Sequence, residues 1–199
     1  LVLLIGMVCF AIGIFYTFGP IPLSRMPLGE VFSGVTMGFG ILFLVVYVNA
    51  YDQGIAHFLW QGTTIGFQAD ILLILEIIWV SLPCVFTIAN LMLANNICDL
   101  EDDIKNHRFT LPYYIGKKNA IRLFDSLYVA TFLAVISAIV FQVLPMVMLL
   151  SLIVIIPVYQ HIRQFKKKQI KAETFSLAVK NLVLVNGSIV TMLLISVII

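Results

Sequence analysis

One short stretch of this sequence, beginning at Asn95, gathers the residue types that bind divalent cations. Asn95, Asp99 and Asp103 recur every four residues. On a continuous helix, which turns about 100° per residue, each of these side chains follows the last with a drift of only about 40°. Two carboxylates one turn apart can share a hard cation such as Mg2+, which prefers oxygen ligands and completes its shell with water and substrate phosphates. The spacing therefore predicts a Mg2+ site at Asp99 and Asp103, with Asn95 beside them.

Basic residues follow the acidic ones closely. Lys105 and Arg108 come within two turns of Asp103, where they could bind phosphate oxygens, the arginine through two parallel hydrogen bonds. A carboxylate face beside a cationic patch suits a diphosphate group with its Mg2+ ion. A plainer interpretation stays open at this point, because acidic runs at the end of a helix are common and are usually only solvated.

The composition predicts that these residues belong to a membrane protein. Hydrophobic residues make up 61% of the 199 residues and charged residues only 11%, against roughly 25% charged residues in a soluble domain. The mean hydropathy is +1.07. We expect an all-α fold, a polytopic helical bundle in which residues 1–199 form a single transmembrane domain surrounded by the lipid bilayer. The net charge of +2 gives no support for a nucleic-acid partner.

Apolar runs predict about six transmembrane helices, each able to cross most of a hydrocarbon core about 30 Å thick. The predicted spans are Leu1–Phe18, Val31–Val48, Ile71–Ala94, Leu123–Leu144, Met146–Gln160 and Leu182–Ile199. The fifth span is short and contains Pro157, so we expect a kink or tilt there. Leu1 already lies within an apolar run, which we interpret as a sign that the chain is a fragment.

Alternate loops carry all of the positive charge. The first, third and fifth loops, with their flanks, contain every lysine and arginine: Arg25, Lys105, Arg108, Lys117, Lys118, Arg122, Arg163, Lys166, Lys167, Lys168, Lys171 and Lys180. By the positive-inside rule these loops are cytoplasmic. The acidic segment after the third span should therefore face the cytoplasm.

At this point the residues resemble a known family. The run N-N-I-x-D-x-x-x-D beginning at Asn95, followed by Arg108 and by T-L-P-x-x-I-G beginning at Thr110, resembles the second Asp-rich motif of the UbiA superfamily of intramembrane prenyltransferases. It is most similar to the MenA branch, which prenylates 1,4-dihydroxy-2-naphthoate in menaquinone biosynthesis. A supporting match lies in the first loop, where Y-T-x-G-P-x-P-L begins at Tyr16 and L-G-E begins at Leu28.

The resemblance implies an architecture of nine transmembrane helices around a cavity, with two Asp-rich motifs on the cytoplasmic side. This chain matches helices four to nine. It lacks helices one to three and the first motif that they carry, so the chain alone is predicted to be inactive. The oligomeric state is not implied.

The resemblance also implies a function. A polyprenyl chain would pass from an allylic polyprenyl diphosphate to an aromatic acceptor, expected to be 1,4-dihydroxy-2-naphthoate, on the cytoplasmic side of a bacterial cell membrane. Catalytic Asp99 and Asp103 would hold Mg2+ as cofactor, and Asn95, Lys105 and Arg108 would bind the diphosphate. Tyr16 and Arg25 are the candidates for binding the carboxylate of the acceptor.

Two other functions stay open. A related prenyltransferase could use another acceptor. A transporter or channel could instead use Glu76 with Asn90, Asn181 and Asn186 as a polar pathway. Transporters concentrate such groups near the bilayer midplane, often at broken helices, whereas the acidic cluster here is predicted at the cytoplasmic rim. The sequence therefore favours the enzyme.

Overall fold

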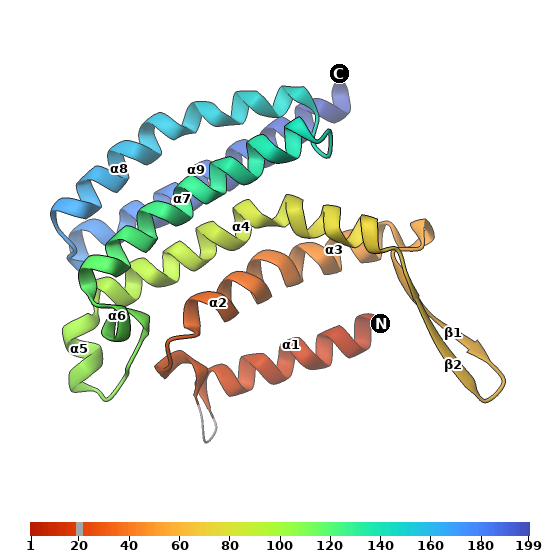
Figure 1. Cartoon of the computed structure of the whole chain (residues 1–199), viewed down its shortest axis with the longest axis horizontal. Coiled ribbons are helices and arrows are strands. Elements are labelled where there is room, and N and C mark those ends of the chain that lie inside the picture. The colour runs from red at the N-terminus through yellow and green to blue at the C-terminus, as the bar shows by residue number, and fades with distance from the viewer. Residues whose placement is uncertain (19–21) are drawn as a thin grey trace.

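The helices of the computed structural model run lengthwise through an elongated bundle (Figure 1). The structure describes residues 1–18 and 22–199. Its α-helices are α1 (Val2–Thr17), α2 (Gly29–Ser33), α3 (Ile41–Asn49), α4 (Ile71–Cys98), α5 (Leu100–Lys105), α6 (Leu111–Ile115), α7 (Lys117–Val140), α8 (Ile155–Lys167) and α9 (Lys171–Ile198). A π-helical segment, Gly34–Gly40, joins α2 to α3, and a 3-10 segment, Met146–Val154, leads into α8.

The predicted fold class, an all-α polytopic membrane bundle, is confirmed. Within the described residues, five helical stretches are long and apolar enough to cross a membrane: Gly29–Asn49, Ile71–Cys98, Lys117–Val140, Met146–Lys167 and Lys171–Ile198. Where the first span was predicted, the structure has the apolar helix α1, whose 16 residues make it shorter than these five.

Two spans extend well beyond their predicted ends. α9 begins at Lys171, not at Leu182, and α8 continues past Gln160 to Lys167. Charged residues in these extra turns lower the hydropathy, but long lysine and arginine side chains can reach the membrane surface from a helix that begins below it. The irregularity predicted at Pro157 is a change from 3-10 to α geometry at Ile155, two residues before the proline, which has no N–H to donate to the preceding turn.

A β-hairpin in the second loop was not anticipated. β1 (Ala56–Gln61) pairs antiparallel with β2 (Thr64–Ala69). The two-residue turn starts at Gly62, whose φ of 62° favours glycine. Phe58 lies in the middle of β1 and packs against Phe67 of β2 with ring centroids 5.3 Å apart.

α4 lies at the centre of the bundle and packs against α7, α9 and the π-helical segment. Gly34 and Gly38 make the last of these contacts possible, as their small-xxx-small spacing predicts. A Cβ atom on Gly34 would lie 2.9 Å from the carbonyl oxygen of Val85, and one on Gly38 would lie 2.6 Å from the Cα atom of Val85. Only glycine lets the two backbones approach this closely.

The loops alternate between the two ends of the bundle, as predicted. Figure 1 shows α5, α6, the start of α2 with the 3-10 turn Leu23–Arg25 before it, and the α8–α9 turn at one end, and the hairpin at the other end with both termini. The three basic loops therefore share one end. That end carries the acidic segment.

We predict that Gly38→Ala separates the π-helical segment from α4 and lowers the stability of the protein by about 1–3 kcal/mol, the usual cost of overpacking. Thermal unfolding in detergent measures the effect. Gly187→Ala is the matched control, because a Cβ atom there meets nothing within 4 Å and alanine favours the helix. Equal melting temperatures for Gly38→Ala and wild type would contradict the prediction.

Candidate functional site

The acidic segment keeps helical spacing across a small break. α4 ends at Cys98, and Asp99 has φ −94° and ψ 4°, outside the α-helical region. The hydrogen bonds nevertheless continue with the same spacing: the Asp99 N–H donates to the Asn95 carbonyl at 3.0 Å and the Asp103 N–H donates to the Asp99 carbonyl at 2.8 Å. Asn95, Asp99 and Asp103 therefore succeed one another turn by turn, as the helical spacing predicts.

Lys171, the first residue of α9, joins this segment. Its ammonium group contacts both Asn95 Oδ1 and Asp99 Oδ2, and lies 5.2 Å from the ring centroid of Phe175. In the sequence, Lys171 stood out only as one of the basic residues of the fifth loop. The one signal that could have found it is the shared side of the third and fifth loops, which brings their charges to the same end of the bundle.

Asp103 is buried, with 4% of its surface exposed. Arg108 Nη1 lies 3.4 Å from Asp103 Oδ1, and the Thr110 hydroxyl donates to Asp103 Oδ2 at 3.5 Å. Burial raises the pKa of Asp103, Arg108 lowers it and the charge of Asp99 raises it again. Asp99 lies one turn before Asp103 on the same segment, and a cation bound near both carboxylates would favour their ionised forms.

The end of α5 explains how Arg108 reaches back to Asp103. His107 has φ 54°, its N–H donates to the Ile104 carbonyl at 3.1 Å, and the Arg108 N–H donates to the Asp103 carbonyl at 2.8 Å. These two bonds with a left-handed residue define a Schellman motif. The motif reverses the direction of the chain, so the side chain of Arg108 lies against Asp103 of α5.

The same turn attaches the first loop to the acidic segment. Arg108 Nη2 donates to the Ser24 carbonyl at 3.3 Å, and the Phe109 N–H donates to the Arg25 carbonyl at 3.1 Å. Arg25 makes this contact through its backbone, and its side chain is exposed. Tyr16 lies deeper, with its hydroxyl 3.4 Å from Ser33 Oγ. Gly19 and Pro20 of the first-loop motif lie outside the described residues.

Lys105 does not join the cluster. Its ammonium group lies 3.1 Å from Asp102 Oδ1, and both side chains are more than 70% exposed, at 72% and 77%. Such a pair contributes little to stability. Of the predicted residues, the structure therefore brings Asn95, Asp99, Asp103 and Arg108 together and leaves Lys105 at the solvated surface.

The oxygen atoms of this cluster suit a hard divalent cation. Within residues 1–18 and 22–199, no three His, Cys, Asp or Glu side chains are placed so that together they could hold a metal ion. Mg2+ does not need three such side chains, because it binds through one or two carboxylates together with water and substrate phosphates. The Lys171 ammonium already places a positive charge against Asn95 Oδ1 and Asp99 Oδ2. Asp99 and Asp103, with the amide oxygen of Asn95, fit the ion that the sequence predicts.

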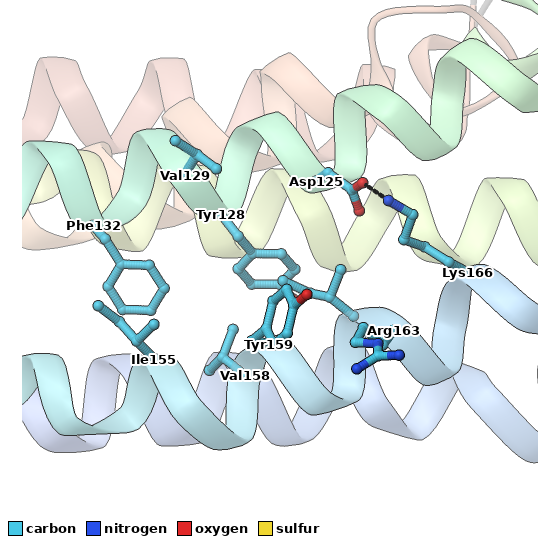
Figure 2. A pocket seen from close by; sticks show the side chains of 10 residues that line it. Asp125, Tyr128, Val129, Phe132, Ile155, Val158, Tyr159, Arg163 and Lys166 are labelled. Carbon is cyan, nitrogen blue, oxygen red and sulfur yellow. Dashed lines mark hydrogen bonds and ion pairs between the residues drawn. The ribbon is translucent and has the colours of Figure 1, made fainter.

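A separate groove lies between α7 and α8 (Figure 2). Its volume is about 520 Å3 and none of its lining residues belongs to the acidic segment. Phe132 and Ile155 form apolar walls at one end, and the ion pair between Asp125 and Lys166 lies at the other. The one carboxylate that lines this groove, the half-buried Asp125, is already paired with a lysine.

The polar groups inside the bundle join helices to one another. Asn90 Nδ2 donates to the Phe124 carbonyl at 3.0 Å, and Asn186 Nδ2 donates to Thr87 Oγ1 at 2.9 Å. Asn181 Oδ1 lies 2.6 Å from a ring nitrogen of His161. Pairing of this kind is the ordinary role of amides in membrane helices. The pairing occupies one polar atom of each asparagine that was considered for a transport pathway, while Glu76 is exposed on α4.

Comparison with known proteins connects this geometry to a family. A family model described as the UbiA prenyltransferase family matches residues 1–184. The chain is also 31% identical, over 137 residues, to a 1,4-dihydroxy-2-naphthoate octaprenyltransferase of Bacillus subtilis (strain 168). The aligned region covers 69% of this chain and 38% of the relative's length. No solved structure matches the chain.

We predict that Arg108→Ala destabilises the protein by about 1–2 kcal/mol, because it leaves the Asp103 carboxylate buried without its charged partner, a loss moderated by the partial exposure of Arg108. The turn should loosen as well, so the Phe109 amide should exchange its hydrogen faster. Thermal unfolding and hydrogen exchange measure the two effects.

Lys105→Ala is the control for this prediction, since it removes an exposed ion pair and should change stability by less than about 0.5 kcal/mol. Equal losses for the two variants would show that the contact between Arg108 and Asp103 carries no special weight.

Proposed function

The chain belongs to the UbiA prenyltransferase family, and on that premise we propose that it forms part of an intramembrane enzyme that moves a polyprenyl chain from an allylic diphosphate to an aromatic acceptor. The observation that supports this most directly is the cluster of Asp99, Asp103, Lys171 and Arg108 at one end of an apolar bundle. Carboxylates and cations of this kind suit a diphosphate group, and the bundle suits a hydrocarbon tail.

In this proposal Asp99 and Asp103 hold Mg2+, as predicted, and Asn95 adds its amide oxygen. When bound, the ion supplies positive charge to the diphosphate as it leaves the allylic carbon. Two carboxylates leave coordination positions free for water, phosphate oxygens and ligands from elsewhere in the enzyme. Stabilising charge that develops on a leaving group is usually the largest contribution to such a rate.

The cationic side chains take the phosphate oxygens. Arg108 is positioned by Asp103 and the Ser24 carbonyl. Lys171 now neutralises Asp99, and a metal ion at Asp99 would release its ammonium group to a phosphate oxygen. Lys105 can join from the surface, since its contact with exposed Asp102 is easily exchanged. The allylic carbon would then lose its bond to the diphosphate oxygen, which leaves with the bonding electron pair, and form a bond to an electron-rich aromatic carbon, shielded from water by the apolar helices. The aromatic ring is restored when that carbon releases the group it carried, a proton or a carboxylate lost as carbon dioxide.

We further propose that the acceptor is 1,4-dihydroxy-2-naphthoate, the compound in the name of the Bacillus subtilis relative, and that the reaction serves menaquinone biosynthesis. Tyr16 and Arg25 would bind its carboxylate, and the Phe109–Arg25 hydrogen bond keeps this loop beside the acidic segment. The basic loops argue for a site on the cytoplasmic face of a bacterial membrane. Another phenolic acceptor is the second candidate.

We predict that Asp99→Asn or Asp103→Asn, made in the full-length enzyme, lowers Mg2+-dependent prenyl transfer at least about 100-fold, because each removes a charge that stabilises the leaving diphosphate. Radiolabelled product formed in proteoliposomes measures the loss.

Asp102→Asn is the matched control, since its side chain is 77% exposed and pairs only with the surface residue Lys105. It should retain activity within about twofold, the range of a weak surface contact. Near wild-type turnover of both the Asp99 and Asp103 variants would refute the assignment.

We also predict that Arg25→Ala raises KM for the naphthoate about tenfold, the effect of losing one hydrogen bond to a charged group, and leaves KM for the polyprenyl diphosphate unchanged. Initial rates with each substrate varied in turn measure both constants. Arg122→Ala removes another exposed basic residue as a control and should change neither. A preference of the enzyme for 4-hydroxybenzoate over the naphthoate would move the assignment to the second candidate.

A further inference from the structure

A chain of hydrogen bonds runs from a buried carboxylate on α2 to the acidic segment. Asn96 Nδ2 donates to Glu30 Oε1 at 2.9 Å, and Asn95 Nδ2 donates to Asn96 Oδ1 at 3.5 Å. Asn95 Oδ1 then accepts from Lys171, whose ammonium group also contacts Asp99. Three side chains, those of Asn96, Asn95 and Lys171, thus connect Glu30 to Asp99. In the sequence, Glu30 stood out only as the last residue of the L-G-E match.

The two ends of this chain fix the direction of every bond in it. A carboxylate offers only acceptors, so Glu30 requires the NH2 group of Asn96. The Asn96 oxygen then faces Asn95, and Asn95 donates its own NH2 group to it. The Asn95 oxygen is left facing Lys171, and an ammonium group offers only donors. One orientation of both amides therefore satisfies all the partners.

We propose that Glu30 is a positioning residue: acting through Asn96, it holds the Asn95 amide with its oxygen, and not its NH2 group, toward the cation at Asp99. This inference rests on the proposed function, in which that cation is Mg2+. Lys171 and Mg2+ require the same orientation of the Asn95 amide, because each binds its oxygen atom. A flipped Asn95 amide would direct an N–H dipole at either of them.

Burial makes the arrangement effective. Glu30 is 4% exposed and Asn96 is 3% exposed, so water cannot replace either partner and let the amides turn freely. The second oxygen of Glu30, Oε2, is buried and has no hydrogen-bond partner among the described residues. Glu30→Gln keeps the shape of the side chain, and nothing described at Oε2 would decide whether its oxygen or its NH2 group faces Asn96.

The test compares Mn2+ binding, followed by electron paramagnetic resonance, in the purified full-length enzyme and its variants. Glu30→Gln should weaken Mn2+ binding about three- to tenfold, up to the loss of one hydrogen bond to a charged group. Glu101→Gln makes the same chemical change at an exposed position of the same acidic segment, and should leave the affinity within about twofold of wild type.

A double variant tests the direction of the bonds directly. Glu30→Gln combined with Asn96→Asp exchanges the amide and the carboxylate, so that the new amide donates to position 96 and the carboxylate there again accepts from Asn95. We expect Mn2+ affinity to return to within about twofold of wild type, because Asn95 meets an acceptor once more. If Glu30 served only to pack the helices, Glu30→Gln would leave Mn2+ binding unchanged, or the double variant would not recover the lost affinity. Either result overturns the proposal.

A second measurement does not depend on a metal. With the Asn95 oxygen no longer fixed, Lys171 should react faster with an amine-acylating reagent in Glu30→Gln, by about threefold or more, and return to its wild-type rate in the double variant. Mass spectrometry of the labelled protein gives the rates. Unchanged rates for all variants would overturn the proposal. If Asp99→Asn binds Mn2+ as tightly as wild type, the proposed metal site fails, and the acylation rates still decide the role of Glu30.

If Glu30→Gln does not fold, Asn96→Asp alone serves instead. It breaks the bond to Glu30 but still offers an acceptor to Asn95, so Mn2+ should bind at least as tightly as in wild type. Weaker binding would show that the bond itself, and not its direction, is what matters.

Discussion

The contact of Lys171 with Asp99 and Asn95 is the interaction on which the organisation of the acidic end depends. It joins the start of α9 to the end of α4, two helices that are neighbours along their length but are separated by about seventy residues of sequence. Without a cation at this point, the Asp99 carboxylate and the Asn95 amide oxygen would lie side by side with no positive charge between them, at the edge of an apolar bundle. Lys171 stabilises the contact between the two helices through these oxygen atoms. In the proposed reaction a metal ion with its diphosphate would bind to the same atoms.

Close packing between neighbouring helices supports the acidic end of the bundle. The π-helical segment contacts α4 through Gly34 and Gly38, which brings α2 close enough for Glu30 to reach Asn96. On the opposite side, Phe124 of α7 stacks on Phe165 of α8 with centroids 4.5 Å apart. The positions of the polar side chains therefore depend on apolar contacts several turns away, as expected of a site carried by helices and not by loops alone.

The sequence predicted the membrane fold, the alternation of loops and the turn-by-turn spacing of Asn95, Asp99 and Asp103, because hydropathy and helical period are local properties. It could not separate Lys105 from Arg108. Both follow Asp103 closely, and only the left-handed His107 turns one of them back toward it. Lys171 and Glu30 were missed for another reason. Their partners lie far away in the sequence, and a hydropathy pattern contains no information about which helices become neighbours.

The depth at which each polar group lies bears on what the bundle does. Amides within the spans are used in pairs between helices: Asn90 with α7, Asn186 with α4 and Asn181 with α8. An unsatisfied amide in hydrocarbon is costly, and each of these amides uses one polar atom to hold two helices together, while Asn90 Oδ1 and Asn181 Nδ2 have no hydrogen-bond partner among the described residues. Ionised groups with exchangeable partners gather instead at the basic end, where a charged headgroup can enter from water while its tail stays in the bilayer. That division, structural amides inside and exchangeable charges at the rim, is what a lipid-modifying enzyme requires and what a transport pathway would reverse.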